Sequence, residues 1–333
     1  MTEHPFAKYI RIIGRGPNLS RPLDEDEMYK AASMILAGDV DRLQLGAFLC
    51  ILRMRTEVPA EGAGFVRAAR DILQRPVDAP VVDLDWASYS GKTRQLPWYL
   101  LAALVLSQND ITICMQGTDG HTQGRMFSSQ ALAQLGVRPA TDLTDAGQQM
   151  RSVNFAYLPL KNFVPRLQEI IELKSILGVR SPINTFARMI NPFNANHEMQ
   201  TVFHPNYRDV HRDTAQLLGQ HHMAVFKGEG GEAERRPHKS VLVQYLHDGV
   251  KSEEYWPELL ADHLYKVDDI MDINRLPKIW AGDETDKYGE FAVIGTVAYV
   301  LRLMQRAKTT HEAITQARTM WDARNRQKMF QTV

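Results

Sequence analysis

The chain has 333 residues, with 39 Lys and Arg against 39 Asp and Glu, so its formal net charge at pH 7 is +0. This balance argues against a protein that is drawn to polyanions by its overall charge, although it allows a local basic patch. The longest apolar run, residues 100–106, is too short to cross a bilayer, so we expect no membrane-spanning segment. The length is enough for a sizeable core divided between two unequal domains.

Two features predict a cytoplasmic location. Residues 1–13 contain no sustained apolar segment of the kind found in a signal peptide. The two cysteines, Cys50 and Cys114, both lie in apolar runs, which is typical of buried, reduced thiols. We therefore expect a cytoplasmic protein without disulfide bonds.

Residues 1–76 have the pattern of a small all-helical domain. The acidic residues at 24–27 suit the first turn of a helix. A second helix is expected from Asp41 and a third from Pro59. Helices this short bury their apolar faces only against other elements, so residues 165–190, which are also helical in pattern, are expected to join them.

Residues 80–333 show short apolar runs that alternate with helical segments. This alternation predicts a large α/β domain with a mostly parallel central sheet and helices on its faces. The expected strands are residues 81–84, 111–115, 155–158, 201–204, 223–227 and 241–246. The segments expected outside the sheet are an irregular stretch at 262–289 and two closing helices at 288–306 and 311–326.

Three glycine-containing loops follow predicted strands, at the sheet edge where ligands gather in α/β proteins. They are residues 88–95, 116–125 and 227–237. The first loop contains Gly91 followed by Lys and Thr, as at the end of a P-loop. The glycine that a P-loop requires five residues earlier is Trp86 here, which excludes a nucleotide triphosphatase. A small-residue turn between strand and helix still presents backbone N–H groups to an anion.

The polar and cationic residues near these loops are candidates for binding phosphate or nucleic acid, because they donate to phosphate oxygens or neutralise their charge. They are Ser88, Ser90, Gly91, Lys92, Thr93, Arg94, Gln116, Gly117, Arg125, Lys174, Arg180, Arg235, Arg236 and Lys239. The alternative for each of them is ordinary surface polarity in contact with solvent. The carboxylates at 229–234 would weaken the positive field of the third loop.

Two longer segments carry a further pattern. Residues 36–57 belong to the predicted helical domain, and residues 177–192 contain Leu-Gly-x-Arg-Ser-x-x-Asn followed by Asn-Pro. These segments resemble the corresponding parts of anthranilate phosphoribosyltransferases, of glycosyltransferase family 3, and the resemblance extends over nearly the whole chain. It implies a small helical domain joined to a large α/β domain and a homodimer through the helical domains. It also implies transfer of phosphoribose from phosphoribosyl pyrophosphate to anthranilate, with Mg²⁺.

The loops depart from that family where it binds diphosphate and metal. The family's Gly-Thr-Gly-Gly-Asp loop falls at residues 88–92, where two glycines are replaced by residues with side chains. Its anthranilate-binding arginine falls at Lys174, which lacks the bidentate fork. Its Asp-Glu metal pair falls at Ala233 and Glu234, which removes one hard oxygen ligand. The candidate Mg²⁺ ligands of an active transferase are Glu229, Glu232 and Glu234.

Residues 13–16, the Ser-Tyr-x-Gly-x-x-x-Gln sequence at 88–95, and residues 227–232 form a second pattern. They are similar to a paralogous group that has this fold, lacks the Gly-Thr-Gly-Gly-Asp motif and is associated with nucleic-acid binding. This resemblance implies a protein that binds single-stranded DNA or RNA instead of transferring phosphoribose to anthranilate. The alternative is an active phosphoribosyl or pentosyl transferase that uses phosphoribosyl pyrophosphate and another acceptor; no catalytic residue is assigned in either case.

Overall fold

The structure, a computed structural model, describes residues 2–16, 18–120, 122–265, 267–268 and 270–330; His121, in the second predicted loop, lies outside them. The helices are α1 (Ala7–Gly14), α2 (Glu25–Ala37), α3 (Arg42–Arg55), α4 (Pro59–Asp71), α5 (Tyr99–Gln108), α6 (Ser128–Gln134), α7 (Leu143–Val153), α8 (Pro165–Glu172), α9 (Lys174–Leu177), α10 (Ile183–Phe186), α11 (Tyr207–Leu217), α12 (Arg275–Ala281), α13 (Lys287–Leu303) and α14 (Thr310–Asp322). The strands are β1 (Leu84–Ser88), β2 (Ile113–Gly117), β3 (Phe155–Pro159), β4 (His197–Val202), β5 (His222–Lys227), β6 (Val241–His247) and β7 (Val250–Trp256).

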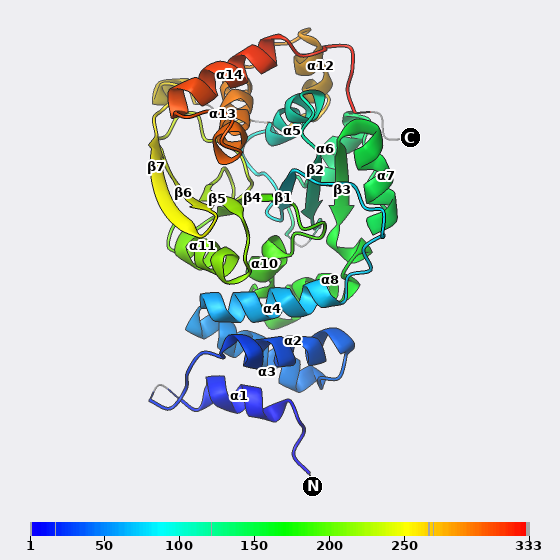
Figure 1. Cartoon of the computed structure of the whole chain (residues 1–333), viewed down its shortest axis with the longest axis vertical. Helices are drawn as coiled ribbons and strands as arrows, with labels where there is room; N and C mark the ends of the chain where they lie inside the picture. Colours follow the sequence, from blue (N-terminus) through cyan, green and yellow to red (C-terminus); the bar gives the residue numbers. More distant parts are fainter. Residues whose placement is uncertain (1, 17, 121, 266, 269, 331–333) are drawn as a thin grey trace.

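One seven-stranded sheet forms the centre of the α/β part, in the order β3-β2-β1-β4-β5-β6-β7. Strands β1 to β5 are parallel to one another, whereas β6 is antiparallel to both β5 and β7. A helical bundle lies beneath this body in Figure 1, with α1 farthest from the sheet. The predicted fold class, a small helical domain joined to an α/β domain with a mostly parallel sheet, is confirmed.

Alternate side chains of β1, and of Tyr89 that follows it, pack into two different cores. Leu84 and Trp86 belong to the main core, which the sheet shares with α5 and α13. Ala87 and Tyr89 belong to the core of the helical bundle, together with residues of α2, α3, α8 and α10. Because successive residues of a strand face opposite sides of the sheet, β1 packs against both cores and holds the sheet next to the helical bundle.

The helical bundle is closely packed around α4. The acidic residues of the first turn of α2 are Glu25, Asp26 and Glu27, as expected, and Asp24 forms a capping box with Glu27. A Cβ atom on Gly64 of α4 would lie only 2.2 Å from the carbonyl oxygen of Glu25, so glycine allows α2 and α4 to approach. On another face of α4, Gly62 allows the same close approach of Thr214 in α11. These contacts join the bundle firmly to the α/β part.

Some predicted boundaries were wrong. The first strand runs from Leu84 instead of residue 81, because Val81 is exposed and Asp83 turns its carboxyl oxygen toward the backbone N–H of Thr112. The fourth begins at His197 and ends before Phe203, whose side chain is exposed. Helix α1 was not predicted, although Phe6 at its start packs on Phe48 of α3 with ring centroids 5.1 Å apart.

Strand β7 and helix α12 were also missed. β7 is an exposed, polar strand, so it lacks the apolar run that marks a buried strand. The sequence feature that could have indicated β7 was the Asp248-Gly249 pair, which forms a turn after β6. Both residues have positive φ, as in a tight hairpin. Helix α12 lies in the segment predicted to be irregular; its Pro277 is tolerated because it falls in the first turn. Within the described residues, no helix combines the length and apolar character needed to span a membrane.

Candidate functional site

The three predicted loops meet at the carboxyl edge of the parallel strands. Nη1 of Arg125, in the second loop, donates to the carbonyl oxygens of Ser90 and Gly91 in the first loop, at 2.9 and 3.2 Å. The same atom donates to the carbonyl oxygen of Gly230 in the third loop, at 3.2 Å. Convergence of the loops, expected from the parallel topology, is therefore confirmed by direct contacts.

A carboxyl group of the chain itself occupies the backbone donors of the first loop. The N–H groups of Ser90 and Gly91 both donate to Oε1 of Glu232, each at 2.5 Å. Glu232 is fully buried; burial raises the pKa of its carboxyl group, while Arg188 and the two N–H donors oppose that shift. The donors that would point at a bound anion are thus satisfied from within the protein.

Lys92 is likewise used internally. Its Nζ forms a buried ion pair with Oε1 of Glu234, and neither side chain is accessible to solvent. Oε2 of Glu234 accepts the backbone N–H of Tyr99, the first residue of α5, at 2.9 Å. Burial raises the pKa of Glu234 to about 7 against the opposing effect of Lys92. Glu234 therefore stabilises the start of α5 from the third loop.

This arrangement does not fit a Mg²⁺ ion. The metal would need Glu232 and Glu234, but Oε1 of Glu232 is held by two N–H groups and Oε1 of Glu234 by an ammonium group. A divalent cation beside Lys92 would also be repelled by it. Over the described part of the chain, no group of three or more His, Cys, Asp or Glu side chains is placed to hold a metal ion.

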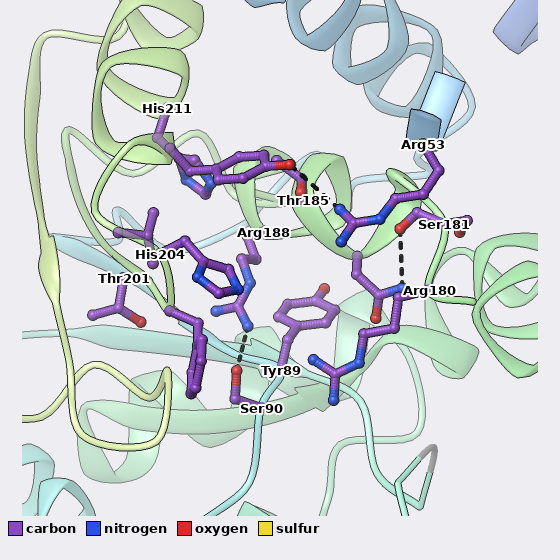
Figure 2. A pocket seen from close by; sticks show the side chains of 14 residues that line it. Arg53, Tyr89, Ser90, Arg180, Ser181, Thr185, Arg188, Thr201, His204 and His211 are labelled. Atoms are coloured by element: carbon purple, nitrogen blue, oxygen red, sulfur yellow. Dashed lines mark hydrogen bonds between the residues drawn. The ribbon is translucent and has the colours of Figure 1, made fainter. Parts of the chain in front are cut away.

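A cavity of about 180 Å³ lies beside the first loop, between the helical bundle and the ends of β1 and β4. We call it the arginine pocket, because Arg53 from the end of α3, Arg180 and Arg188 line it (Figure 2). The other described lining residues are uncharged or are histidines, and none is Asp or Glu. Three guanidinium groups without a lining carboxylate favour an anionic ligand.

The three arginines come from separate segments and are held by neutral groups. Nη2 of Arg188 donates to Oγ of Ser90 at 2.7 Å. Nη2 of Arg180 donates to Oγ1 of Thr122 at 3.1 Å, and Nη1 of Arg53 donates to the hydroxyl of a tyrosine of α11 at 3.3 Å. The pKa of Arg180 is lowered by burial and by the charges of Arg125 and Arg53. An anion bound among these guanidinium groups would relieve that repulsion.

A neutral histidine completes the inner wall of the arginine pocket. His211 is buried, and burial together with the charge of Arg188 lowers its pKa to about 3. Its Nδ1 lies 2.7 Å from Oε1 of Gln200, whose amide group donates to Glu198, so Nδ1 carries the proton. The pocket therefore contains fixed positive charge from arginine and no titrating histidine at this position near pH 7.

A second cavity of about 320 Å³, the loop pocket, lies between the three loops. It is lined by Thr93, Arg94, Arg125, Phe203, Lys227, Gly228, Glu229, Gly230 and Arg236. Phe203 lines both pockets, so the two are neighbours. The loop pocket is also mostly cationic, although the carboxyl group of Glu229 reduces its positive charge.

The structure separates the predicted binding residues into three groups. Ser90 and Arg180 line the arginine pocket, and Lys174 reaches Thr122 beside it at 3.4 Å. Thr93, Arg94, Arg125, Glu229 and Arg236 line the loop pocket. The predicted residues outside both linings are Ser88, Gly91, Lys92, Gln116, Gly117, Glu232, Glu234, Arg235 and Lys239.

Buried contacts explain several of these exclusions. Ser88 bonds the hydroxyl of Ser128 at 2.6 Å, and Gln116 bonds the hydroxyl of Tyr89 beneath the loop. Gly117 is needed for strand packing, because a Cβ there would lie 2.0 Å from a backbone oxygen of β1. Arg235 is fully buried and donates to Tyr299 at 2.8 Å.

Two arginines of the pocket were not predicted. Arg53 has the position of an ordinary cation in the last turn of a helix, and Arg188 lies in a short helical turn within a largely apolar segment. No local pattern distinguishes either from a structural residue. Because both arginines are far from the glycine loops in sequence, their closeness to these loops in space could not be predicted.

Comparison with known proteins supports the observed fold. Residues 7–72 match the family model described as glycosyl transferase family, helical bundle domain. An uncharacterized protein of Aquifex aeolicus is 27% identical over 301 residues, which cover 87% of this chain and 90% of the relative. An anthranilate phosphoribosyltransferase of Syntrophomonas wolfei is 24% identical over 326 residues, which cover 96% and 94%.

Among solved structures, the anthranilate phosphoribosyltransferase of Saccharomyces cerevisiae in complex with PRPP and Mg has a TM-score of 0.80 at 16% identity. The alignment covers 99% of this chain and 97% of that one. The chain therefore has the fold of anthranilate phosphoribosyltransferases. At this identity the similarity establishes the fold and leaves the chemistry to the residues of the site.

The buried pair of Lys92 and Glu234 predicts a specific pH dependence of stability. The pKa of Glu234 is about 7 in the folded protein and lower in the unfolded chain, so the folded protein holds a proton that the unfolded chain releases. Its contribution to the free energy of unfolding should be complete below about pH 4 and should be lost as the pH rises through about 7. Urea unfolding of wild type and Glu234→Gln between pH 5 and 8 measures it.

We expect the wild-type free energy of unfolding to decrease relative to that of Glu234→Gln across this range. The control is Glu169→Gln, which removes an exposed carboxylate paired with Arg166 at the surface; its curve should remain parallel to wild type. Parallel curves for Glu234→Gln and wild type would contradict the assignment.

Proposed function

We propose that this protein binds single-stranded nucleic acid through the arginine pocket and the loop pocket. The observation that carries the proposal is the group of Arg53, Arg180 and Arg188 around one cavity without a lining carboxylate. Arginines recognise phosphate through planar, bidentate hydrogen bonds and keep their charge at any relevant pH. The loop pocket extends the cationic surface from Phe203 to Arg236.

The shape of the site favours a single strand over a duplex. Arg188 is only 9% exposed and lies within the arginine pocket, so a rigid duplex cannot bring a phosphate to it. A single strand can enter a narrow cavity and can stack its bases on exposed aromatic side chains. Phe203, which is 55% exposed between the two pockets, provides such a surface.

The same residues argue against phosphoribosyl transfer to anthranilate. Transfer requires stabilisation of a leaving diphosphate, usually by backbone donors and a metal ion. Here the donors of Ser90 and Gly91 are occupied by Glu232, and Glu234 is neutralised by Lys92. We infer that the first loop keeps its position at the sheet edge, and that its backbone N–H donors form hydrogen bonds within the protein.

The second candidate is a phosphoribosyl or pentosyl transferase that uses phosphoribosyl pyrophosphate, Mg²⁺ and an acceptor other than anthranilate. Its support is the similarity to the yeast structure that is in complex with PRPP and Mg. It requires Glu232 to leave the two N–H groups before a diphosphate can take its place.

We also propose that two copies of the chain associate through the helical bundle. A groove of about 590 Å³ between α3 and the segment α8–α9 is lined mainly by Leu and Ile side chains. Leu43 and Ile176 at this groove are 84% and 79% exposed, which is unusual for large apolar residues. A second copy would bury this surface and would bring two sets of pockets into one particle.

Binding of nucleic acid should be salt-dependent and should depend on the arginine pocket. A 20-nucleotide single strand with a 5′-phosphate should lose affinity between 50 and 200 mM salt, as measured by fluorescence anisotropy. The double variant Arg53→Ala with Arg180→Ala should weaken binding at least tenfold at 50 mM salt. It should also reduce the slope of log K against log salt by roughly 0.7 to 1.4, because one or two phosphate contacts are lost.

The matched control removes two arginines that lie outside both pockets. Arg138→Ala with Arg151→Ala causes the same change in net charge but affects surface pairs with Asp145 and Asp78. This control should bind within about twofold of wild type. Equal losses in the two double variants, or no salt-sensitive binding in the wild type, would refute the proposed site.

Release of the loop donors should create affinity for diphosphate. Wild type should give no measurable heat with phosphoribosyl pyrophosphate and Mg²⁺ in isothermal titration calorimetry, because Glu232 occupies the N–H groups. Glu232→Ala should bind at least tenfold more tightly than wild type. Glu229→Ala is the control of equal charge change, since its side chain does not occupy these donors. Tight, Mg²⁺-dependent binding by wild type would favour the transferase.

The dimer should depend on the apolar groove. Sedimentation velocity should give a dimer for wild type and a monomer for Leu43→Glu with Ile176→Glu, because two buried charges would oppose association. Val77→Glu, at another fully exposed apolar position, should leave the dimer intact. A wild-type monomer at tens of micromolar protein would refute this interface.

A further inference from the structure

The arginine pocket has fixed polar groups on its wall. Arg188 and Ser90 are nearly or fully buried, and their side chains bond each other at 2.7 Å. Ser181, which is also buried, has an Oγ atom without a hydrogen-bond partner among the described residues. A buried hydroxyl without a partner is costly unless a ligand or water completes it. This hydroxyl lies buried in the wall, and the three guanidinium groups are the charged donors that line the cavity.

The charge of the pocket exceeds that of one internal phosphate. An internal phosphodiester carries a single negative charge, whereas a terminal phosphate monoester carries about −1.5 to −2 at pH 7 and has three acceptor oxygens. Arg53, Arg180 and Arg188 provide three positive charges, of which that of Arg188 is partly offset by the buried carboxyl group of Glu232. Burial and the charges of neighbouring arginines lower the pKa of Arg180. A dianionic end group matches this site better than a monoanionic link.

The shape of the pocket points the same way. An internal phosphate has a chain on both sides, and a cavity of about 180 Å³ would have to make room for both. A terminal phosphate has a chain on one side only. Phe203 and His204 both line the arginine pocket, with ring centroids 5.0 Å apart, and both are exposed. The first base would stack there, and the strand would continue into the loop pocket.

We infer that the arginine pocket holds the terminal phosphate of a single strand, with the first base on Phe203 and the following phosphates in the loop pocket. This inference rests on the proposed function and adds to it a preference for phosphorylated ends. It assigns separate tasks to the two pockets: the arginine pocket selects the end, and the loop pocket holds the strand.

The test compares the same 12-nucleotide strand with a 5′-phosphate, a 3′-phosphate, a 5′-phosphate methyl ester and hydroxyl ends, by fluorescence anisotropy at constant salt. One of the two phosphorylated strands should bind about tenfold more tightly than the hydroxyl-ended strand, which also identifies the end recognised. If that end is 5′, the methyl ester should lose most of the advantage, because it keeps only one negative charge. The advantage should grow between pH 5 and 7.5, as the end group with a second pKa near 6 loses its last proton.

Variants distinguish the two pockets. Arg188→Gln and, as a more exposed alternative that spares the core, Arg53→Gln should reduce the preference for the phosphorylated end to less than threefold. Arg94→Ala with Arg236→Ala in the loop pocket should weaken all strands alike and leave the preference unchanged. Equal binding of phosphorylated and hydroxyl-ended strands would overturn this inference but leave the proposed function standing. Absence of binding by every strand would refute both.

Discussion

The pair of hydrogen bonds from Ser90 and Gly91 to Glu232 is the contact on which the site depends. These bonds close the first loop onto the third and occupy the N–H groups of Ser90 and Gly91, so these two donors are not available to an outside anion. Because the carboxyl group is fully buried, breaking these bonds would leave both the donors and the acceptor without partners, at a cost of several kcal/mol. The loop is therefore held in one conformation by the protein's own acid.

The ion pair of Lys92 and Glu234 acts in the same direction. It takes Lys92, one of the two cations of the glycine turn, away from solvent and uses the partner carboxyl group to stabilise the start of α5. The positive charge that remains accessible is carried by Arg94 of the same turn, in the loop pocket, and by arginines from other segments around the arginine pocket. The anion site that we propose therefore lies beside the glycine turn.

One fold can accommodate different chemistry, because function lies in the residues of the site. The overall fold of this chain is that of anthranilate phosphoribosyltransferases. The chemistry depends on which donors at the sheet edge remain available, and a few side chains decide that without any change of architecture. Arg188, in a short turn beside Tyr89, illustrates this, since its guanidinium group lies 5.5 Å from that ring and forms the inner end of the pocket.

The sequence by itself determined the fold class, the cap of α2 and the meeting of three loops at one sheet edge. These follow from local patterns and from the rule that parallel strands end on the same side. Only the tertiary structure decided which groups face a ligand. Ser90 and Glu232 lie 142 positions apart, and Arg53 approaches the loops only through the packing of the helical bundle. Hydrogen-bond partners so distant in sequence leave no periodic or compositional trace, so burial of Lys92 and exposure of the arginine pocket could not be predicted from the chain alone.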